Sequence, residues 1–252
     1  MLFHRIVGAK TRHLCLHALL ALAPASIAHA QTHEYALTHS LQDLHGGTAL
    51  VSHGGQIAQD GYRFQHNQGL SLNVNLGASW SVVLRSSFND NRNYNKILDL
   101  DGGRIDDGYY SHHGAARWYD VARNTTPVYV DGQFAVTVLT RSADGMLRAY
   151  VNGVQQFAVL DAAGIGVQSA IDPLRFFMDD NRTQAEASDG VVSYIGLYDD
   201  ALTAEQIATI DGTPTVPVYV SEPAGLWSLS AAMLGLMIMG ARRRRQPPMR
   251  SL

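Results

Sequence analysis

Short runs in which apolar and polar residues alternate fill the middle of the chain. Val82 and Leu84 alternate with Val83 and Arg85, and the same two-residue period recurs over 136–139 and 147–151. Successive side chains of a β-strand point to opposite faces, so this period predicts half-buried strands. Because no helical period is found between residue 34 and about residue 198, the pattern predicts an all-β body.

Turn residues divide the apolar runs. Asp144-Gly145 and Asn152-Gly153 separate three of them within 134–160. Such pairs tolerate the positive φ of tight hairpins, so three consecutive antiparallel strands are expected there. Many short strands with frequent turns are typical of a two-sheet antiparallel sandwich or jelly roll.

One short helix is predicted where the strand pattern ends. Thr203 is a suitable N-cap, and Gln206 three residues later completes a capping box. Leu202 and Ile207 are placed to pack against each other around this start. We expect the helix to end near Asp211-Gly212, and residues 213–221 then form a Pro-containing linker.

The N-terminal 30 residues have the pattern of a secretory signal peptide. Basic residues precede an apolar run, which ends in the small residues Ala28 and Ala30 of an A-x-A cleavage site. The only cysteine, Cys15, lies in this segment, so we expect the exported chain to contain no disulfide.

A second apolar segment lies near the C-terminus. Residues 224–241 form an uncharged run of about 27 Å if helical, which suffices to cross a bilayer core. Four basic residues follow it, and the positive-inside rule places them in the cytoplasm: Arg242, Arg243, Arg244 and Arg245. The segment therefore predicts a precursor that is anchored in the inner membrane with its body outside.

Charge is distributed unevenly along the chain. All 22 Asp and Glu residues lie between Glu34 and Glu222, while eight of the 19 Lys and Arg residues lie in the two ends. An acidic body repels phosphate backbones, which argues against nucleic-acid binding. It suits calcium, which prefers oxygen ligands.

Two acidic loops contain the candidate calcium ligands. Asp101 and Asp107 lie in LDLDGGRIDDG around a glycine turn, and Asp179, Asp180 and Asn181 end the strand of FFMDDN. Calcium takes six to eight oxygens, and loops with spaced Asp residues supply several. Turn formation is the alternative, because Asp side chains also bond to their own backbone.

Aromatic residues around position 110 are candidates for a sugar-binding platform. Tyr109, Tyr110 and Tyr119 are the candidate ligand-binding residues, whereas Trp80 and Trp118 are expected in the core. In an unbroken strand, Tyr109 and Tyr119 would share one face, and Tyr110 and Trp118 the other. The alternative is that most of these rings fill the core.

Catalytic patterns are sparse. Only Glu34, Glu186 and Glu205 precede the linker, and there is no G-x-S-x-G elbow. His112 and His113 are adjacent, and neighbouring side chains of a strand point to opposite faces, which disfavours a shared metal. Paired Asp residues remain an alternative for hydrolysis.

Four stretches resemble, in order, the laminin-G-like branch of the concanavalin A-like lectin/glucanase superfamily: 61–72, 96–119, 134–157 and 174–210. The third contains a strand ending in Arg141 and the sequence YVNG, and the fourth continues through IGLY to ALTAEQI. The resemblance covers about 33–212. It implies two face-to-face antiparallel sheets and a calcium ion at the rim. The E-x-D-x-x-E run of the hydrolytic branch does not occur here.

Residues 220–245 resemble the PEP-CTERM sorting signal of Gram-negative bacteria. The resemblance rests on Glu222-Pro223, the apolar run and the arginine cluster, and Ser221 departs from the usual V-P-E-P. It implies cleavage near Glu222-Pro223 by a membrane sorting protease, an exosortase.

Together these features predict a non-catalytic protein of the cell surface or extracellular matrix. Its sandwich is expected to bind a glycan or a protein partner, with calcium as a candidate cofactor. The alternatives are a structural or adhesive surface protein without a small ligand, and a glycoside hydrolase.

Overall fold

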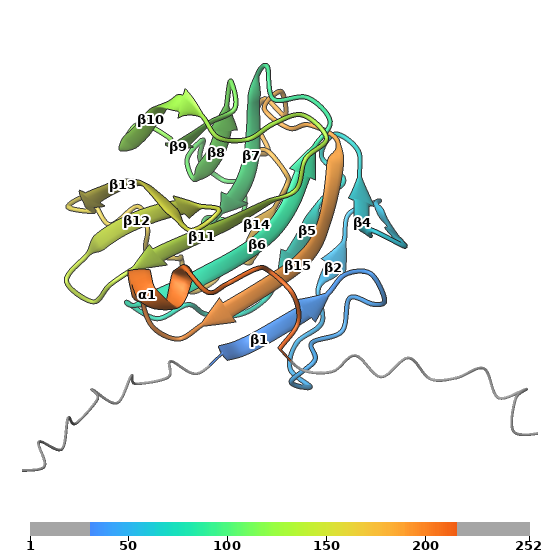
Figure 1. The fold of residues 1–252 in the computed structure, drawn as a ribbon, viewed down its shortest axis with the longest axis horizontal. Coiled ribbons are helices and arrows are strands. Elements are labelled where there is room, and N and C mark those ends of the chain that lie inside the picture. Colours follow the sequence, from blue (N-terminus) through green and yellow to red (C-terminus); the bar gives the residue numbers. More distant parts are fainter. Residues whose placement is uncertain (1–30, 216–252) are drawn as a thin grey trace, which may run out of the picture.

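The computed structural model describes residues 31–215, which form a sandwich of two antiparallel sheets (Figure 1). The predicted signal peptide, most of the linker and the sorting segment lie outside the described residues. The predicted all-β, two-sheet architecture is confirmed.

Sheet A contains eight strands. Its spatial order is β13 (Val154–Leu160), β12 (Met146–Val151), β11 (Ala135–Arg141), β6 (Trp80–Phe88), β15 (Gly190–Tyr198), β4 (Gly61–Phe64) and β3 (Gln56–Ala58). β1 (Gln31–Ala36) also pairs with β15.

Sheet B contains seven strands and carries the candidate site. Its spatial order is β10 (Ala122–Pro127), β9 (Ala115–Trp118), β8 (Tyr109–His112), β7 (Tyr94–Asp99), β14 (Leu174–Phe176), β5 (Leu70–Leu72) and β2 (Val51–Ser52). β7 and β14 are neighbours although they are distant in sequence, and the loops that follow them meet where the Asn181 N–H donates to the carbonyl of Gly103 (2.9 Å).

The two predicted hairpins of sheet A are present. β11, β12 and β13 are consecutive and antiparallel. Asn152 and Gly153 adopt φ values of 49° and 76°, and Gly145 has a φ of 83°. These left-handed conformations allow the tight reversals that the Asx-Gly pairs predict.

The core lies between the sheets, and it confirms that alternate residues of the strands face opposite sides. Val82 and Leu84 of β6 face it, whereas Val83 packs on the opposite face of sheet A. Trp80 and Trp118 are fully buried with ring centroids 6.5 Å apart. The Trp80 indole donates to the carbonyl of Gly166 (3.0 Å), which satisfies its buried N–H.

Helix α1 (Ala204–Ile207) covers the outer face of sheet A. Its predicted capping box is confirmed, since Thr203 accepts from Gln206 N–H and the Gln206 side chain accepts from Thr203 N–H. The expected end near Asp211 is wrong. After Ile207 the backbone tightens to bonds of i→i−3 type, and the Thr209 hydroxyl donates to the carbonyl of Gln206 (2.7 Å).

Within residues 31–215, no helix is long and apolar enough to cross a membrane.

Close packing of β5 against β14 fixes the start of one acidic loop. A Cβ at Gly69 would lie 1.9 Å from the carbonyl oxygen of Phe176. Only glycine allows this approach without a shift of the backbone. Because Asp179 and Asp180 follow β14 after only the buried Phe177 and Met178, their position depends on this contact.

Candidate functional site on the outer face of sheet B

One row of side chains crosses four strands of sheet B. Lys96 of β7 pairs with Tyr110 of β8, Tyr110 with Arg117 of β9, and Arg117 with Arg123 of β10. Directly opposed residues of antiparallel strands share a face. Their neighbours Tyr109 and Trp118 belong to the core, so the row lies on the outer face.

Three tyrosines of this face, Tyr94, Tyr110 and Tyr119, form what we call the tyrosine cluster. Their ring centroids are 5.6 to 6.3 Å apart. Tyr110 is fully buried beneath the other two, which are half-buried and reach the surface. The ring of His112 stacks on Tyr94 (3.7 Å), and the Arg117 guanidinium lies 5.2 Å from the Tyr94 ring and 5.3 Å from the Tyr119 ring.

Tyr109, predicted to bind ligand, belongs to the core instead. It is 0% exposed, and its hydroxyl is 2.9 Å from that of Tyr129. The predicted parity is wrong because the strand does not run unbroken. A turn after His112 reverses the chain, so Tyr109 pairs with Trp118, and Tyr110 and Tyr119 share the outer face.

The same turn brings His112 and His113 together. His113 has a φ of 51°, and the two ring centroids lie 4.2 Å apart. The expectation that the rings point to opposite faces is wrong, because β8 ends at His112.

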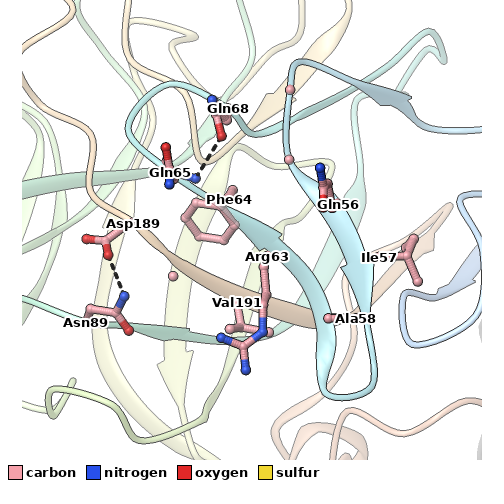
Figure 2. A pocket seen from close by; sticks show the side chains of 13 residues that line it. Gln56, Ile57, Ala58, Arg63, Phe64, Gln65, Gln68, Asn89, Asp189 and Val191 are labelled. Carbon is pink, nitrogen blue, oxygen red and sulfur yellow. Dashed lines mark hydrogen bonds between the residues drawn. The ribbon is translucent and has the colours of Figure 1, made fainter.

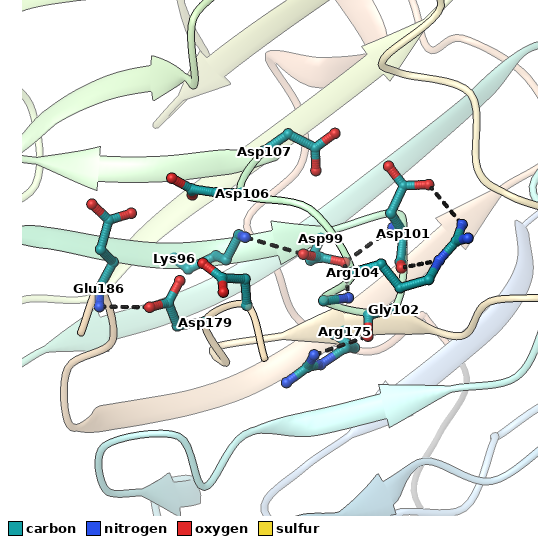
Figure 3. A network of polar contacts seen from close by, with 12 residues as sticks. Lys96, Asp99, Asp101, Gly102, Arg104, Asp106, Asp107, Arg175, Asp179 and Glu186 are labelled. Atoms are coloured by element: carbon teal, nitrogen blue, oxygen red, sulfur yellow. Dashed lines mark hydrogen bonds and ion pairs between the residues drawn. The ribbon is translucent and has the colours of Figure 1, made fainter. Parts of the chain in front are cut away.

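Seven carboxylates lie on β7 and on the loops near Lys96, at the other end of the row, and Figure 3 labels all of them except Asp180. We call this set the acidic cluster: Asp99, Asp101, Asp106, Asp107, Asp179, Asp180 and Glu186. Lys96 is fully buried, with its Nζ 3.0 Å from Asp99 Oδ2 and 5.1 Å from the ring centroid of Tyr110. The cluster therefore combines β7 with the loops that precede β8 and follow β14.

Three of these residues have the geometry to hold a metal ion. One carboxylate oxygen each from Asp106, Asp179 and Asp180 lie within 4.8 Å of one another. Asp179 is 1% exposed, and its Oδ1 has no hydrogen-bond partner in the described part of the chain. Its Oδ2 accepts from the Glu186 N–H (2.8 Å). An unpaired buried oxygen among crowded carboxylates fits a bound cation. The cation would provide a partner for that oxygen and reduce the repulsion between the carboxylates.

The other predicted metal ligands make different contacts. Asn181 Oδ1 accepts from Arg175 (3.0 Å), and Asp101 lies 3.6 Å from the Arg104 guanidinium. Asp101 and Asp107 are therefore outside the three-carboxylate group, whose third member is Asp106. Asp180 also stabilises a turn, as the alternative role for these Asp residues predicts, because its Oδ1 accepts from the Arg182 and Thr183 N–H groups.

Burial and like charges disfavour ionisation of two members of the acidic cluster, Glu186 and Asp107. The pKa of Asp180 is instead lowered, because hydrogen bonds from Arg182 and Thr183 outweigh the effect of burial. Burial, together with the charges of Asp106 and Asp179, raises the pKa of Glu186 to about 7. Burial, together with Asp101 and Asp99, raises the pKa of Asp107 to about 7. Lys96 opposes both shifts without cancelling them. The cluster is thus short of positive charge.

A separate hollow of about 510 Å³ lies beside β3 and β4 (Figure 2). Its polar lining includes Gln56, Gln65 and Asn89, and Asn89 donates to Asp189 (2.5 Å). The aromatic residue in its lining, Phe64, is only 3% exposed. This hollow therefore has a buried aromatic ring, whereas Tyr94 and Tyr119 of sheet B are only half-buried.

No protein-family model matches this chain, and no curated protein matches it. Among solved structures, it is similar to a Trypanosoma rangeli sialidase in complex with 2,3-difluoro-KDN, with a TM-score of 0.55 and 14% identity. The match covers 70% of this chain and 31% of the sialidase. It is also similar to the botulinum neurotoxin serotype D binding domain, with a TM-score of 0.53, 11% identity, and coverage of 71% and 50%. The chain thus spans about a third and a half of these proteins, and identities this low show the fold alone.

The raised pKa values predict how stability depends on pH without divalent cations. The folded-state pKa values near 7 exceed the ordinary values of 4.5 for Glu186 and 3.8 for Asp107. Between about pH 4 and 7 the folded protein therefore binds more protons than the unfolded chain. The stability that these two groups contribute at low pH is lost as the pH rises through 7. His53 and His112, whose pKa values are lowered by burial, act in the opposite sense.

Thermal melts in EDTA at pH 5.0 and 7.5 (chosen to bracket the transition at roughly pH 7) separate these effects. Compared with wild type, the Glu186→Gln/Asp107→Asn variant should gain stability at the higher pH and gain less at the lower pH. An identical pH dependence in both proteins would contradict the assignment.

Proposed function

We propose that this protein is a non-catalytic module that binds glycan through the outer face of sheet B and holds a calcium ion beside it. The observation that carries the proposal is the tyrosine cluster, whose two half-buried rings reach the surface next to charged side chains. Aromatic faces stack on the apolar faces of sugar rings, while charged and polar groups bond to the hydroxyls.

Calcium is the cation that the ligand set favours. The three converging side chains offer only carboxylate oxygens, without His or Cys. Hard oxygen ligands select calcium or magnesium, and a loop-built, irregular site suits the flexible coordination of calcium better.

The cation site and the tyrosine cluster are linked through Tyr110. The Tyr110 hydroxyl donates to Asp106 Oδ1 (2.9 Å) and to the carbonyl of Asp107 (3.2 Å). A cation that fixes Asp106 therefore also fixes the ring beneath Tyr94 and Tyr119. This linkage makes calcium-dependent glycan binding the expected behaviour.

Two further considerations support a glycan ligand. The similar sialidase was solved with 2,3-difluoro-KDN, a sugar acid derivative. The sequence resembles laminin-G-like domains over about 33–212, and its ends resemble export and sorting signals. We therefore place the mature protein at the surface or in the extracellular matrix of a Gram-negative bacterium, after exosortase cleavage near Glu222-Pro223.

The raised pKa of Glu186 also suits a general acid, which would favour a hydrolase. A cation site without its cation produces the same shift, because the carboxylates then repel one another. The unpaired Asp179 Oδ1 is explained by a cation and not by an acid catalyst, so we propose binding without turnover.

Replacing Tyr119 by Ala should abolish glycan binding, because it removes a ring face that reaches the surface. Tyr198→Ala is the matched control, since Tyr198 is also half-buried but lies on sheet A. A polysaccharide array should retain signal for Tyr198→Ala and lose it for Tyr119→Ala. Equal binding by both variants would exclude this face, and release of reducing ends by wild type would contradict a non-catalytic role.

Calcium should raise the melting temperature at neutral pH, and EDTA should reverse the effect. At 100 times the dissociation constant, a single site stabilises by about 2.7 kcal/mol, which corresponds to roughly 5–10 °C for a domain of this size. Asp179→Asn should remove the response, whereas Asp189→Asn, at an exposed position outside the acidic cluster, should keep it. A wild-type melting temperature that is unchanged by calcium would contradict the site.

A further inference from the structure

We propose that β8, β9 and β10 form an anion-binding subsite, so that the glycan is an acidic one whose carboxylate or sulfate group binds Arg117 and Arg123. The inference rests on the proposed function and specifies its ligand class.

Arg117 and Arg123 are directly opposed on neighbouring antiparallel strands. Like charges in this position destabilise a sheet unless a counter-charge lies between them. Neither arginine has a carboxylate partner within residues 31–215. Four other arginines form ion pairs with Asp residues: Arg63, Arg92, Arg104 and Arg141. Four more arginines of the described chain form none, and Arg117 and Arg123 differ from these because they lie directly opposite each other. The opposed pair therefore has an unmet requirement for negative charge.

Two hollows provide room for an anion beside this pair. One, of about 260 Å³, is lined by both arginines together with His112, His113, Asn124 and Thr125. The other, of about 320 Å³, is lined by the same two arginines together with Trp118, Asp120, Val121 and Ala122. Asp120 lies in the second hollow but forms no ion pair within the described chain, so the first hollow is the more positive.

The imidazole of His112 lies beside the two arginines and is affected by their positive charge. Burial lowers the pKa of His112, and the charges of His113, Arg117 and Arg123 lower it further. A bound anion would offset these charges and favour the imidazolium. Apart from the apolar Ala115 and Pro127, the lining of the first hollow thus consists of cations and neutral hydrogen-bonding side chains, with no carboxylate among them.

The location of the subsite ties it to the tyrosine cluster. Arg117 lies within 5.3 Å of the ring centroids of both Tyr94 and Tyr119. A sugar stacked on these rings would direct an anionic substituent towards Arg117 and Arg123. Arg117 lies directly beside these rings and Arg123 lies opposite it, so the anionic substituent is expected at this end of the row.

Calorimetric titration of the exported protein tests the proposal with paired ligands. The probes are a galacturonic acid oligomer and its methyl ester, and a sulfated galactan oligomer and its desulfated form. We expect wild type to bind at least one acidic probe at least about tenfold more tightly than its neutral partner, as for loss of one charge-assisted contact. The acidic probe that binds identifies the anion as carboxylate or sulfate.

Arg123→Gln should reduce the affinity for the acidic form to that for its neutral partner. Arg148→Gln is the matched control, because it removes the same charge from β12 of sheet A. Equal affinity for acidic and neutral partners would overturn the anion subsite while leaving glycan binding intact.

A second measurement keeps the inference testable if none of these glycans binds. Inorganic sulfate, titrated at constant ionic strength, should shift the His112 ring resonances of wild type, and Arg123→Gln should abolish that shift. No sulfate-dependent shift in wild type would overturn the subsite.

Discussion

The buried ion pair between Lys96 and Asp99 organises the outer face of sheet B. Both side chains are fully buried, and removing such charges from water costs several kcal/mol per ion. Asp99 Oδ1 also accepts from the N–H groups of Asp101 (3.0 Å) and Gly103 (2.8 Å), which shapes the loop before β8. Lys96 lies against Tyr110 on the adjacent strand. The acidic loop and the tyrosine cluster therefore depend on one pair of charges.

That arrangement divides the face into three regions with different chemistry. Carboxylates with too little positive charge lie at one end, rings lie in the middle, and two opposed arginines lie at the other end. A cation at the first region and an anion at the third would each relieve local repulsion. Ligand binding and fold stability are thus coupled through the same residues, as expected when a functional site is not optimised for stability.

Much of the fold was predictable from the sequence, because its signals are local. The alternation in β6, the Asx-Gly turns of β11–β13 and the capping box at Thr203 each act within a few residues. The candidate site was less predictable because it joins distant segments. Asp106 and Asp179 meet only because β7 and β14 are neighbours in sheet B.

The outcome differed among individual residues. Asp179, Asp180, Tyr110 and Tyr119 were anticipated from acidic loops and aromatic spacing, and the structure places them on one side of sheet B. The sequence does not single out Lys96 or Tyr94, and it leaves Asp106 and Glu186 outside the candidate ligands. Lys96 looked like an ordinary charge in an apolar strand, and Tyr94 carried no aromatic neighbour in sequence. Tyr109 was misassigned because its orientation depends on the turn after His112; Gly114, with a φ of 74°, was the available signal.

A crystal structure of the exported protein grown with calcium and an acidic oligosaccharide tests the central claim most directly. The account predicts a cation between Asp106, Asp179 and Asp180, a sugar ring on Tyr94 and Tyr119, and the anionic substituent at Arg117 and Arg123. An oligosaccharide bound instead in the hollow beside β3 and β4, with the outer face of sheet B empty, would contradict it.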